Sequence, residues 1–223
     1  MSLEIKNLSK HFFQGTAKIE VLRQLNARVD TGEIVAILGQ SGSGKSTLLS
    51  LIAGLEKPNE GEILLDKNDI VPMDEKALTS FRAKNLSLVF QQYHLVSHLT
   101  ALENVSLPLE IIGESQSTSR AENLLKELGL GHRLDHFPHQ LSGGECQRVA
   151  IARALVTHPK VLLADEPSGN LDVETGEKVM TVFLNLVRQH RATTLIVTHN
   201  ENLARQCQRI LRLKEGHLVE TTL

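Results

Sequence analysis

One stretch decides the fold of this chain: Gly39-Gln40-Ser41-Gly42-Ser43-Gly44-Lys45-Ser46-Thr47. An apolar run at residues 34–38 precedes it, and a second apolar run follows at residues 48–53. This order predicts a buried strand, a glycine-rich loop and the first turns of a helix. The backbone N–H groups of such a loop surround a phosphate group at the positive end of the helix. The stretch therefore predicts an α/β fold with a phosphate-binding loop.

The side chains of this loop suit a nucleoside triphosphate and its metal ion. Lys45 is placed to reach the β- and γ-phosphates, and the hydroxyl of Ser46 to bind Mg²⁺. The alternative, a chance turn rich in glycine and serine, matches this pattern in roughly one per cent of chains of this length. The flanking strand and helix lower that frequency further. The candidate triphosphate-binding residues are Gly39, Gln40, Ser41, Gly42, Ser43, Gly44, Lys45, Ser46 and Thr47.

Composition indicates one globular unit without a surface for nucleic acid. The chain has 223 residues, of which 41% are hydrophobic, enough to bury a large core. Its formal net charge of -2 gives no basic field of the kind that attracts DNA or RNA. We therefore expect no nucleic-acid partner.

The sequence also favours a cytosolic setting. No apolar run reaches the roughly 18 residues needed to cross a bilayer, and the first residues lack the apolar core of a signal peptide. The two cysteines, Cys146 and Cys207, do not make a disulfide framework, which fits a reducing compartment. We expect any role at a membrane to come through a partner chain.

The order of elements predicts an α/β core interrupted by a helical insertion. Strands are predicted at 3–8, 19–29, 34–38, 62–65, 86–90, 161–164 and 194–197, helices at 45–53, 120–128 and 175–189, and a closing hairpin at 210–213 and 217–220. Between residues 91 and 154 the pattern is helical and rich in loops. We therefore expect a single domain over 1–223. Its nucleotide-binding core, which includes a β subdomain, covers 1–90 and 155–223, and a helical subdomain covers 91–154.

Two acids end one of the predicted strands. Asp165 and Glu166 follow the apolar run at 161–164, and acids at the carboxyl end of a parallel strand face the ligand crevice. Asp165 would hold Mg²⁺, directly or through water. Glu166 would polarise a water molecule for attack on the γ-phosphate. An acid pair that caps a helix before Pro167 is the alternative, and the glycine-rich loop elsewhere in the chain makes it the weaker one.

A second glycine turn, Ser142-Gly143-Gly144-Glu145, opens an apolar-periodic segment at 149–156. Serine and glycine at a helix N-terminus form another anion site, although as an isolated string the turn is only a capping box. One γ-phosphate does not need two complete anion-binding sites from one chain. We therefore expect a dimer in which this turn completes the site of the other copy.

Together these motifs resemble those of the ABC ATPases over nearly the whole chain. In that family the loop at 39–47 corresponds to Walker A, residues 161–166 to Walker B, and residues 141–145 to the signature motif. The resemblance implies a P-loop NTPase core of the RecA-like type. It adds an antiparallel β subdomain and a helical ABC subdomain inserted between Walker A and Walker B. It also implies ATP and Mg²⁺ as ligands and hydrolysis of ATP to ADP and phosphate.

Further roles come from this resemblance alone. Gln91 resembles the family's glutamine that senses Mg²⁺ and the attacking water, and residues 168–172 resemble the loop that crosses the dimer interface. His199 resembles the histidine that contacts the γ-phosphate. Phe12 stands where an aromatic ring stacks on adenine, with Phe13 as an alternative. The resemblance thus implies catalytic Glu166, His199 and Gln91, metal-binding Ser46, Gln91 and Asp165, and additional ATP-binding residues Phe12, Ser142, Gly143, Gly144 and Glu145.

Within the family, residues 101–105 and 166–172 resemble the MacB/LolD/FtsE branch, with the YbbA type most similar and the LolD type next. This implies an ATPase at the cytoplasmic face of the inner membrane. A separate integral permease would hold it there and act on lipophilic or lipoprotein substrates, and a periplasmic component would be reached through that permease. An FtsE-like signalling role, or lipoprotein release of the LolD kind, is the alternative. DNA-acting and translational relatives fit less well, because the chain lacks a long coiled-coil insertion and carries one set of motifs.

Overall fold

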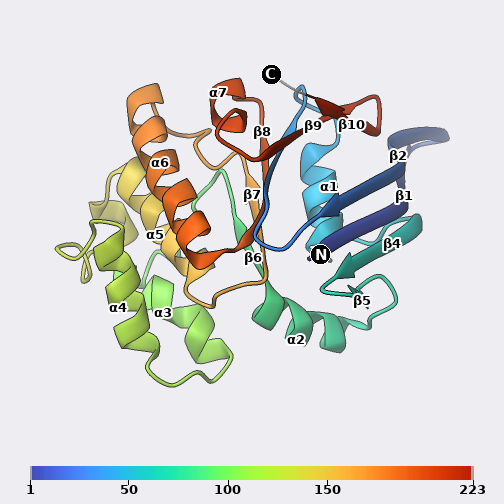
Figure 1. Cartoon of the computed structure of the whole chain (residues 1–223). Helices are drawn as coiled ribbons and strands as arrows, with labels where there is room; N and C mark the ends of the chain where they lie inside the picture. Colours follow the sequence, from blue (N-terminus) through green and yellow to red (C-terminus); the bar gives the residue numbers. More distant parts are fainter. Residues whose placement is uncertain (1, 222–223) are drawn as a thin grey trace.

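Two β-sheets, with helices between and around them, form the computed structural model, which describes residues 2–221 (Figure 1). The larger sheet has the strand order β10-β9-β3-β8-β7-β6 and is parallel apart from β10. Its strands are β3 (Ile34–Leu38), β6 (Leu86–Val89), β7 (Val161–Asp165), β8 (Thr193–Thr198), β9 (Arg209–Lys214) and β10 (His217–Thr221). This arrangement is the predicted α/β core.

The central strands are apolar throughout because both faces of the parallel sheet are covered. Every residue of β3 is buried, and Ala36 and Leu38 pack in a separate small cluster with α7 and β9. Val35 and Ile37 face the core that contains α1, whereas Ile34 faces the core that contains α6. The register Leu38↔Thr198 places the carboxyl ends of β3 and β8 side by side.

The smaller sheet is antiparallel, with the order β2-β1-β4-β5. It contains β1 (Leu3–Gln14), β2 (Ala17–Val29), β4 (Glu60–Leu65) and β5 (Asn68–Asp69). The predicted alternation at residues 3–8 and 19–29 therefore marks true strands, and both are longer than predicted. The β1–β2 register shifts between Lys10 and His11, since Lys10 pairs with Leu22 but His11 pairs with Glu20.

Helices cover both faces of the larger sheet. Helix α1 (Lys45–Ile52) lies between the two sheets, and α5 (Gly143–Leu155) and α6 (Val173–His190) cover the opposite face (Figure 1). Helices α3 (Ala101–Ile111) and α4 (Ser117–Glu127) pack beside α5. The remaining helices are α2 (Glu75–Asn85), α7 (Glu201–Ala204) and the short 3-10 helix η1 (Pro138–Gln140).

Helices α2 and α7 lie outside every segment that the sequence predicted to be helical. Helix α2 begins after Asp74, whose side chain accepts a hydrogen bond from the N–H of Ala77. Only Leu78 of this helix is buried, so no apolar stripe marks it, and the capping aspartate is its main sequence signal. Within residues 2–221, no helix combines the length and the hydrophobicity needed to cross a bilayer.

Candidate functional site

A cleft of about 770 Å³ lies where the glycine-rich loop meets the carboxyl ends of β7 and β8. This volume is in the range that small ligands occupy. Neighbouring parallel strands end at the same edge of a sheet, which brings residues far apart in sequence together there. The cleft is lined by Val21, Gln40, Ser41, Gly42, Gly44, Lys45, Ser46, Thr47, Gln91, Asp165, Glu166 and His199.

The glycine-rich loop holds a backbone shape that side chains would not permit. Gly44, the residue before α1, has φ 99, a left-handed conformation that favours glycine. A Cβ atom there would lie 2.7 Å from Cγ1 of Val21. Glycine at this position therefore lets β2 approach the start of α1 and leaves the backbone open to a ligand.

The polar groups of the loop fit a triphosphate. The Nζ of Lys45 donates hydrogen bonds to the carbonyls of Gly39 and Gln40, at 2.9 Å each, and the residue is only 8% exposed. Its ammonium group is thus held over the loop, where phosphate oxygens can replace the carbonyls. The buried hydroxyl of Ser43 has no hydrogen-bond partner within residues 2–221.

Oxygen ligands for a hard cation gather beside the loop. Burial raises the pKa of the Asp165 carboxyl, Glu166 raises it further, and a hydrogen bond from Ser46 together with nearby Lys45 opposes these effects. Gln91 lines the same cleft. A carboxylate, a hydroxyl and an amide oxygen are the donor types that Mg²⁺ accepts, so these residues fit that ion.

Glu166 and His199 form a contact at the edge of the cleft. Oε2 of Glu166 lies 2.9 Å from Nδ1 of His199 and accepts longer hydrogen bonds from the Thr198 hydroxyl and the His199 N–H, both at 3.3 Å. The Glu166 side chain is 16% exposed and that of His199 is 72% exposed. The carboxylate is therefore fixed at the end of β7, beside a largely exposed histidine that lines the same cleft.

Gln91 is held by the loop that follows Glu166. Its Nε2 donates to Oδ1 of Asn170 at 3.2 Å, and Nδ2 of Asn170 donates to the Gln91 carbonyl at 3.0 Å. A Cβ atom at Gly169 would lie 2.8 Å from Nε2 of Gln91. The loop at 168–172 therefore forms a close seat for this glutamine.

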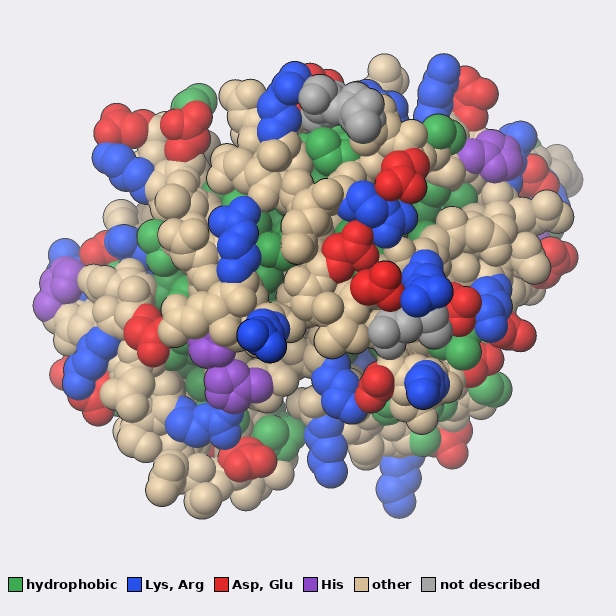
Figure 2. Space-filling model, in the orientation of Figure 1, with side chains coloured by type: hydrophobic (Ala, Val, Ile, Leu, Met, Phe, Trp, Pro, Cys, Tyr) green, Lys and Arg blue, Asp and Glu red, His purple; other side chains and the backbone are tan. Residues whose placement is uncertain are grey.

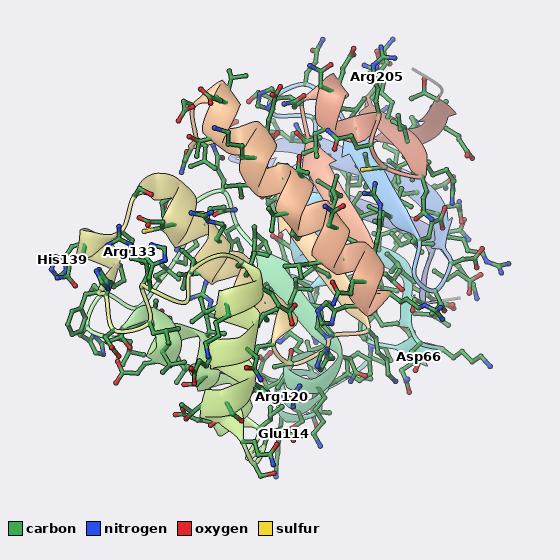
Figure 3. All side chains as sticks on the ribbon, turned by 60° about the vertical axis from the view of Figure 1, so that its left-hand side comes forward. Asp66, Glu114, Arg120, Arg133, His139 and Arg205 are labelled. Carbon is green, nitrogen blue, oxygen red and sulfur yellow. The ribbon has the colours of Figure 1, made fainter. Side chains whose placement is uncertain are left out.

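The second glycine turn lies outside this cleft, at the N-terminus of α5. Ser142 and Glu145 form the reciprocal capping box. The backbone N–H and the hydroxyl of Ser142, with nearby Arg133, hold the pKa of Glu145 below its usual range against the effect of burial. Figure 3 shows Arg133 in the segment before α5, and its Nε lies 3.0 Å from Oε1 of Glu145. The capping box and Arg133 thus hold the turn in place, and none of its residues lines the cleft of its own chain.

Phe12 is also outside the lining of the cleft. It lies on β1 opposite Ile19 and is 39% exposed. Val21, which the sequence did not single out, lines the cleft instead. No local sequence pattern marks Val21 as a cleft residue. Lys10 pairs with Leu22 and His11 pairs with Glu20, so Val21 is the additional β2 residue at this register shift.

Comparisons with known proteins agree on one family. The family model described as ABC transporter matches residues 22–169. The chain is 48% identical over 220 residues to the uncharacterized ABC transporter ATP-binding protein YbbA of Escherichia coli (strain K12), covering 98% of this chain and 96% of that protein. It is 47% identical over 220 residues to the lipoprotein-releasing system ATP-binding protein LolD of Pseudomonas fluorescens, covering 97% and 96%.

Solved structures give the same result. A dimeric post-hydrolysis state of the ATP-binding cassette MJ0796 bound to ADP and Pi has a TM-score of 0.89 and 42% identity, covering 99% of this chain and 98% of that chain. A second dimeric structure of MJ0796, described as a bacterial ABC transporter cassette, has a TM-score of 0.90 at the same identity and coverage.

Proposed function

The chain belongs to the ABC transporter family and is an ATP-binding subunit with ATPase activity; on that premise, we propose that it drives a separate integral membrane permease. The family membership supports the permease, and the observation that carries the ATPase mechanism is the meeting of Lys45, Asp165, Glu166 and His199 in one cleft. These residues come from three separate parts of the chain, and each has the chemistry that phosphoryl transfer to water requires.

In this proposal the loop at 39–47 binds the phosphates of ATP and Lys45 contacts the β- and γ-phosphates. Ser46, Gln91 and Asp165 would hold Mg²⁺, which supplies charge neutralisation on the phosphates. Glu166 would accept a proton from the attacking water, and His199 would orient the γ-phosphate. The half-buried Glu166 carboxylate accepts hydrogen bonds from the Thr198 hydroxyl and the His199 backbone, which supports its assignment as the base.

A second copy of the chain would complete each site. The dimeric MJ0796 cassettes support such a dimer, and the position of Ser142–Glu145 outside the cleft of this chain leaves these residues available to a partner copy. We propose that these residues approach the triphosphate of the partner copy in a head-to-tail arrangement. ATP would favour the closed dimer because it binds that state more tightly.

The permease would contact the segment that follows Gln91. Residues 92–95, with Pro138, Leu141, Gly143 and Cys146, line an open hollow of about 530 Å³. We propose that a segment of the permease enters it, and that residues 91–154 move as the helical subdomain. The chain would then lie at the cytoplasmic face of the cell membrane. Figure 2 shows acidic and basic side chains interspersed over the face in view, a mixture that does not suggest nucleic-acid binding.

The similarity to LolD, a lipoprotein-releasing system ATP-binding protein, supports a lipophilic or lipoprotein substrate. The permease, with any periplasmic component, would select that substrate. An FtsE-like signalling ATPase and a LolD-type lipoprotein-release subunit are the alternatives, because the same motor would serve each of them.

The first experiment is substitution of Glu166→Gln in the full chain. The amide oxygen can keep the bonds to Thr198 and His199, so ATP binding should persist, while loss of the base should slow turnover by about 10²–10⁴-fold. Glu174→Gln is the matched control, since the Glu174 side chain is 80% exposed on α6. Wild-type turnover in Glu166→Gln would refute the assignment.

The permease is tested by capturing tagged Glu166→Gln protein, with ATP and Mg²⁺, from detergent-solubilised membranes. Recovery of one integral membrane protein, identified by mass spectrometry, supports a transporter motor and names its branch. ATP-dependent dimers without any membrane protein would contradict the proposal.

A further inference from the structure

Lys10 has an environment unusual for a lysine. Lys10 and Lys45 are the lysines buried within residues 2–221, and both are 8% exposed. Lysine is seldom buried unless its charge is paired. The phosphate-binding loop explains Lys45, whereas Lys10 lies on β1 and the proposed ATPase mechanism gives it no role.

The ammonium group of Lys10 is fixed by three contacts. Its Nζ donates a hydrogen bond to the carbonyl of Lys57 at 2.7 Å and lies 2.9 Å from Oε1 of Glu56. The same atom lies over the ring of Phe12, 4.9 Å from the ring centroid. An ammonium group within about 6 Å of an aromatic face is attracted by the π-electrons. Lys10 therefore connects Phe12 to the segment that follows α1.

The position of Phe12 leaves room for a second ring. Lys10 and Phe12 are two residues apart on β1, where alternate side chains share a face. Lys10 covers part of the Phe12 ring, yet Phe12 remains 39% exposed. The register shift of β2 beside this pair makes Val21 an additional residue, and Val21 lines the triphosphate cleft. Phe12 is thus on the strand that pairs with β2, two positions along β2 from Val21 through its partner Ile19.

We propose that Lys10 is a positioning residue for the nucleotide base. It holds the Phe12 ring in place from one side, and the purine of ATP stacks on the exposed side of that ring. The inference rests on the proposed binding of ATP and on the role that the family resemblance gives Phe12, which is contact with adenine. The ion pair with Glu56 keeps the ammonium group in place, so the ring is oriented before the nucleotide binds.

A purely structural brace between β1 and the segment after α1 makes a different prediction. Loss of a structural brace would lower the affinity of every ligand of the phosphate-binding loop to the same extent. Loss of a positioning residue for Phe12 would lower the affinity only of ligands that carry a base. Inorganic tripolyphosphate, which has the phosphates of ATP and no base, separates the two.

The test compares Mg²⁺-dependent binding of ATP and of tripolyphosphate to the full-length chain by titration calorimetry. Lys10→Met should weaken ATP binding about fivefold, a loss within the range of cation–π contacts, and leave tripolyphosphate binding unchanged. Lys6→Met is the matched control, because Lys6 lies on the same strand with a side chain that is 45% exposed. Equal weakening of both ligands, or no weakening of ATP, would overturn the inference.

Two further variants keep the result decisive. Lys10→Gln removes the charge but can still donate to the Lys57 carbonyl, and it should show the same base-dependent loss if Lys10→Met does not fold. Phe12→Ala should also weaken ATP alone, and Lys10→Met should add nothing in that background. A further fivefold loss of ATP affinity when Lys10→Met is added to Phe12→Ala would refute the role of Lys10. If Phe12→Ala left ATP affinity unchanged, the proposed adenine contact would itself be wrong.

Discussion

Gln147 allows a sharp test of how the catalytic loops are held. This α5 residue is 0% exposed. Its Nε2 donates a 2.6 Å hydrogen bond to the carbonyl of Pro167, directly after Glu166, and lies 3.5 Å from the carbonyl of Phe90, directly before Gln91. Its Oε1 is buried without a hydrogen-bond partner anywhere in residues 2–221. The donor end of the side chain therefore carries the interaction.

We expect a pH-independent loss of stability from one substitution of Gln147 and a pH-dependent loss from another of similar size. Gln147→Met removes the donor and leaves the Pro167 carbonyl buried and unpaired, which costs about 1–2 kcal/mol of unfolding free energy at any pH. Gln147→Glu keeps a donor only while its carboxyl is protonated. Holding a carboxyl protonated roughly three pH units above its usual pKa costs about 4 kcal/mol.

The direction of this pH dependence follows from the difference in pKa between the folded and unfolded states. Burial against two carbonyl oxygens raises the folded-state pKa of the new carboxyl. The stability it contributes is therefore present below its unfolded pKa and is lost as pH rises. Urea unfolding of both variants and wild type at several pH values from about 5 to 7.5 measures the effect. The free energy of unfolding of Gln147→Glu should fall increasingly below that of wild type as pH rises. The free energy of unfolding of Gln147→Met should differ from that of wild type by the same amount at every pH. Parallel curves for all three proteins would refute the reasoning.

The remaining predictions concern the loop, the metal site and the core. Gly44→Ala should weaken ATP binding at least tenfold in a calorimetric titration, because the left-handed backbone and the 2.7 Å approach to Val21 exclude a Cβ atom. Asp165→Asn should raise the melting temperature of the nucleotide-free chain at neutral pH, since burial raises the Asp165 pKa and its charged form costs stability. The gain in melting temperature should vanish as pH falls below the usual pKa of an aspartate, and a gain that does not depend on pH would contradict this explanation. Phe183→Ala, at a fully buried core position, should lower unfolding free energy by about 3–5 kcal/mol in urea titrations.

Much of the fold was predictable because its signals are local. The glycine-rich loop between apolar runs predicted β3, α1 and the turn that joins them, and β3 has the predicted bounds. The apolar run that ends at Asp165 predicted β7 and the position of its acids at a ligand crevice. Helix α2 was not predicted, since one buried leucine leaves no periodic pattern to detect.

The candidate site was only partly predictable. The residues of the loop, Asp165 and Glu166 could be named from motif and position, and all of them except Gly39 and Ser43 line one cleft. Gln91 and His199 were named from resemblance alone, and they line the same cleft. Val21 could not be found from sequence, since its place depends on a register shift in β2.

The sequence by itself determined the local chemistry: which loop can surround phosphates, which strands are buried on both faces, and which acids end a strand. These properties depend on neighbours a few residues away, as when Lys45 bonds to Gly39 and Gln40. The tertiary structure alone decided which distant groups meet. Gln91 and Asn170 are 79 residues apart and exchange two hydrogen bonds. Such pairs depend on how sheets and helices pack, because burial of apolar surface carries no preference for particular polar partners.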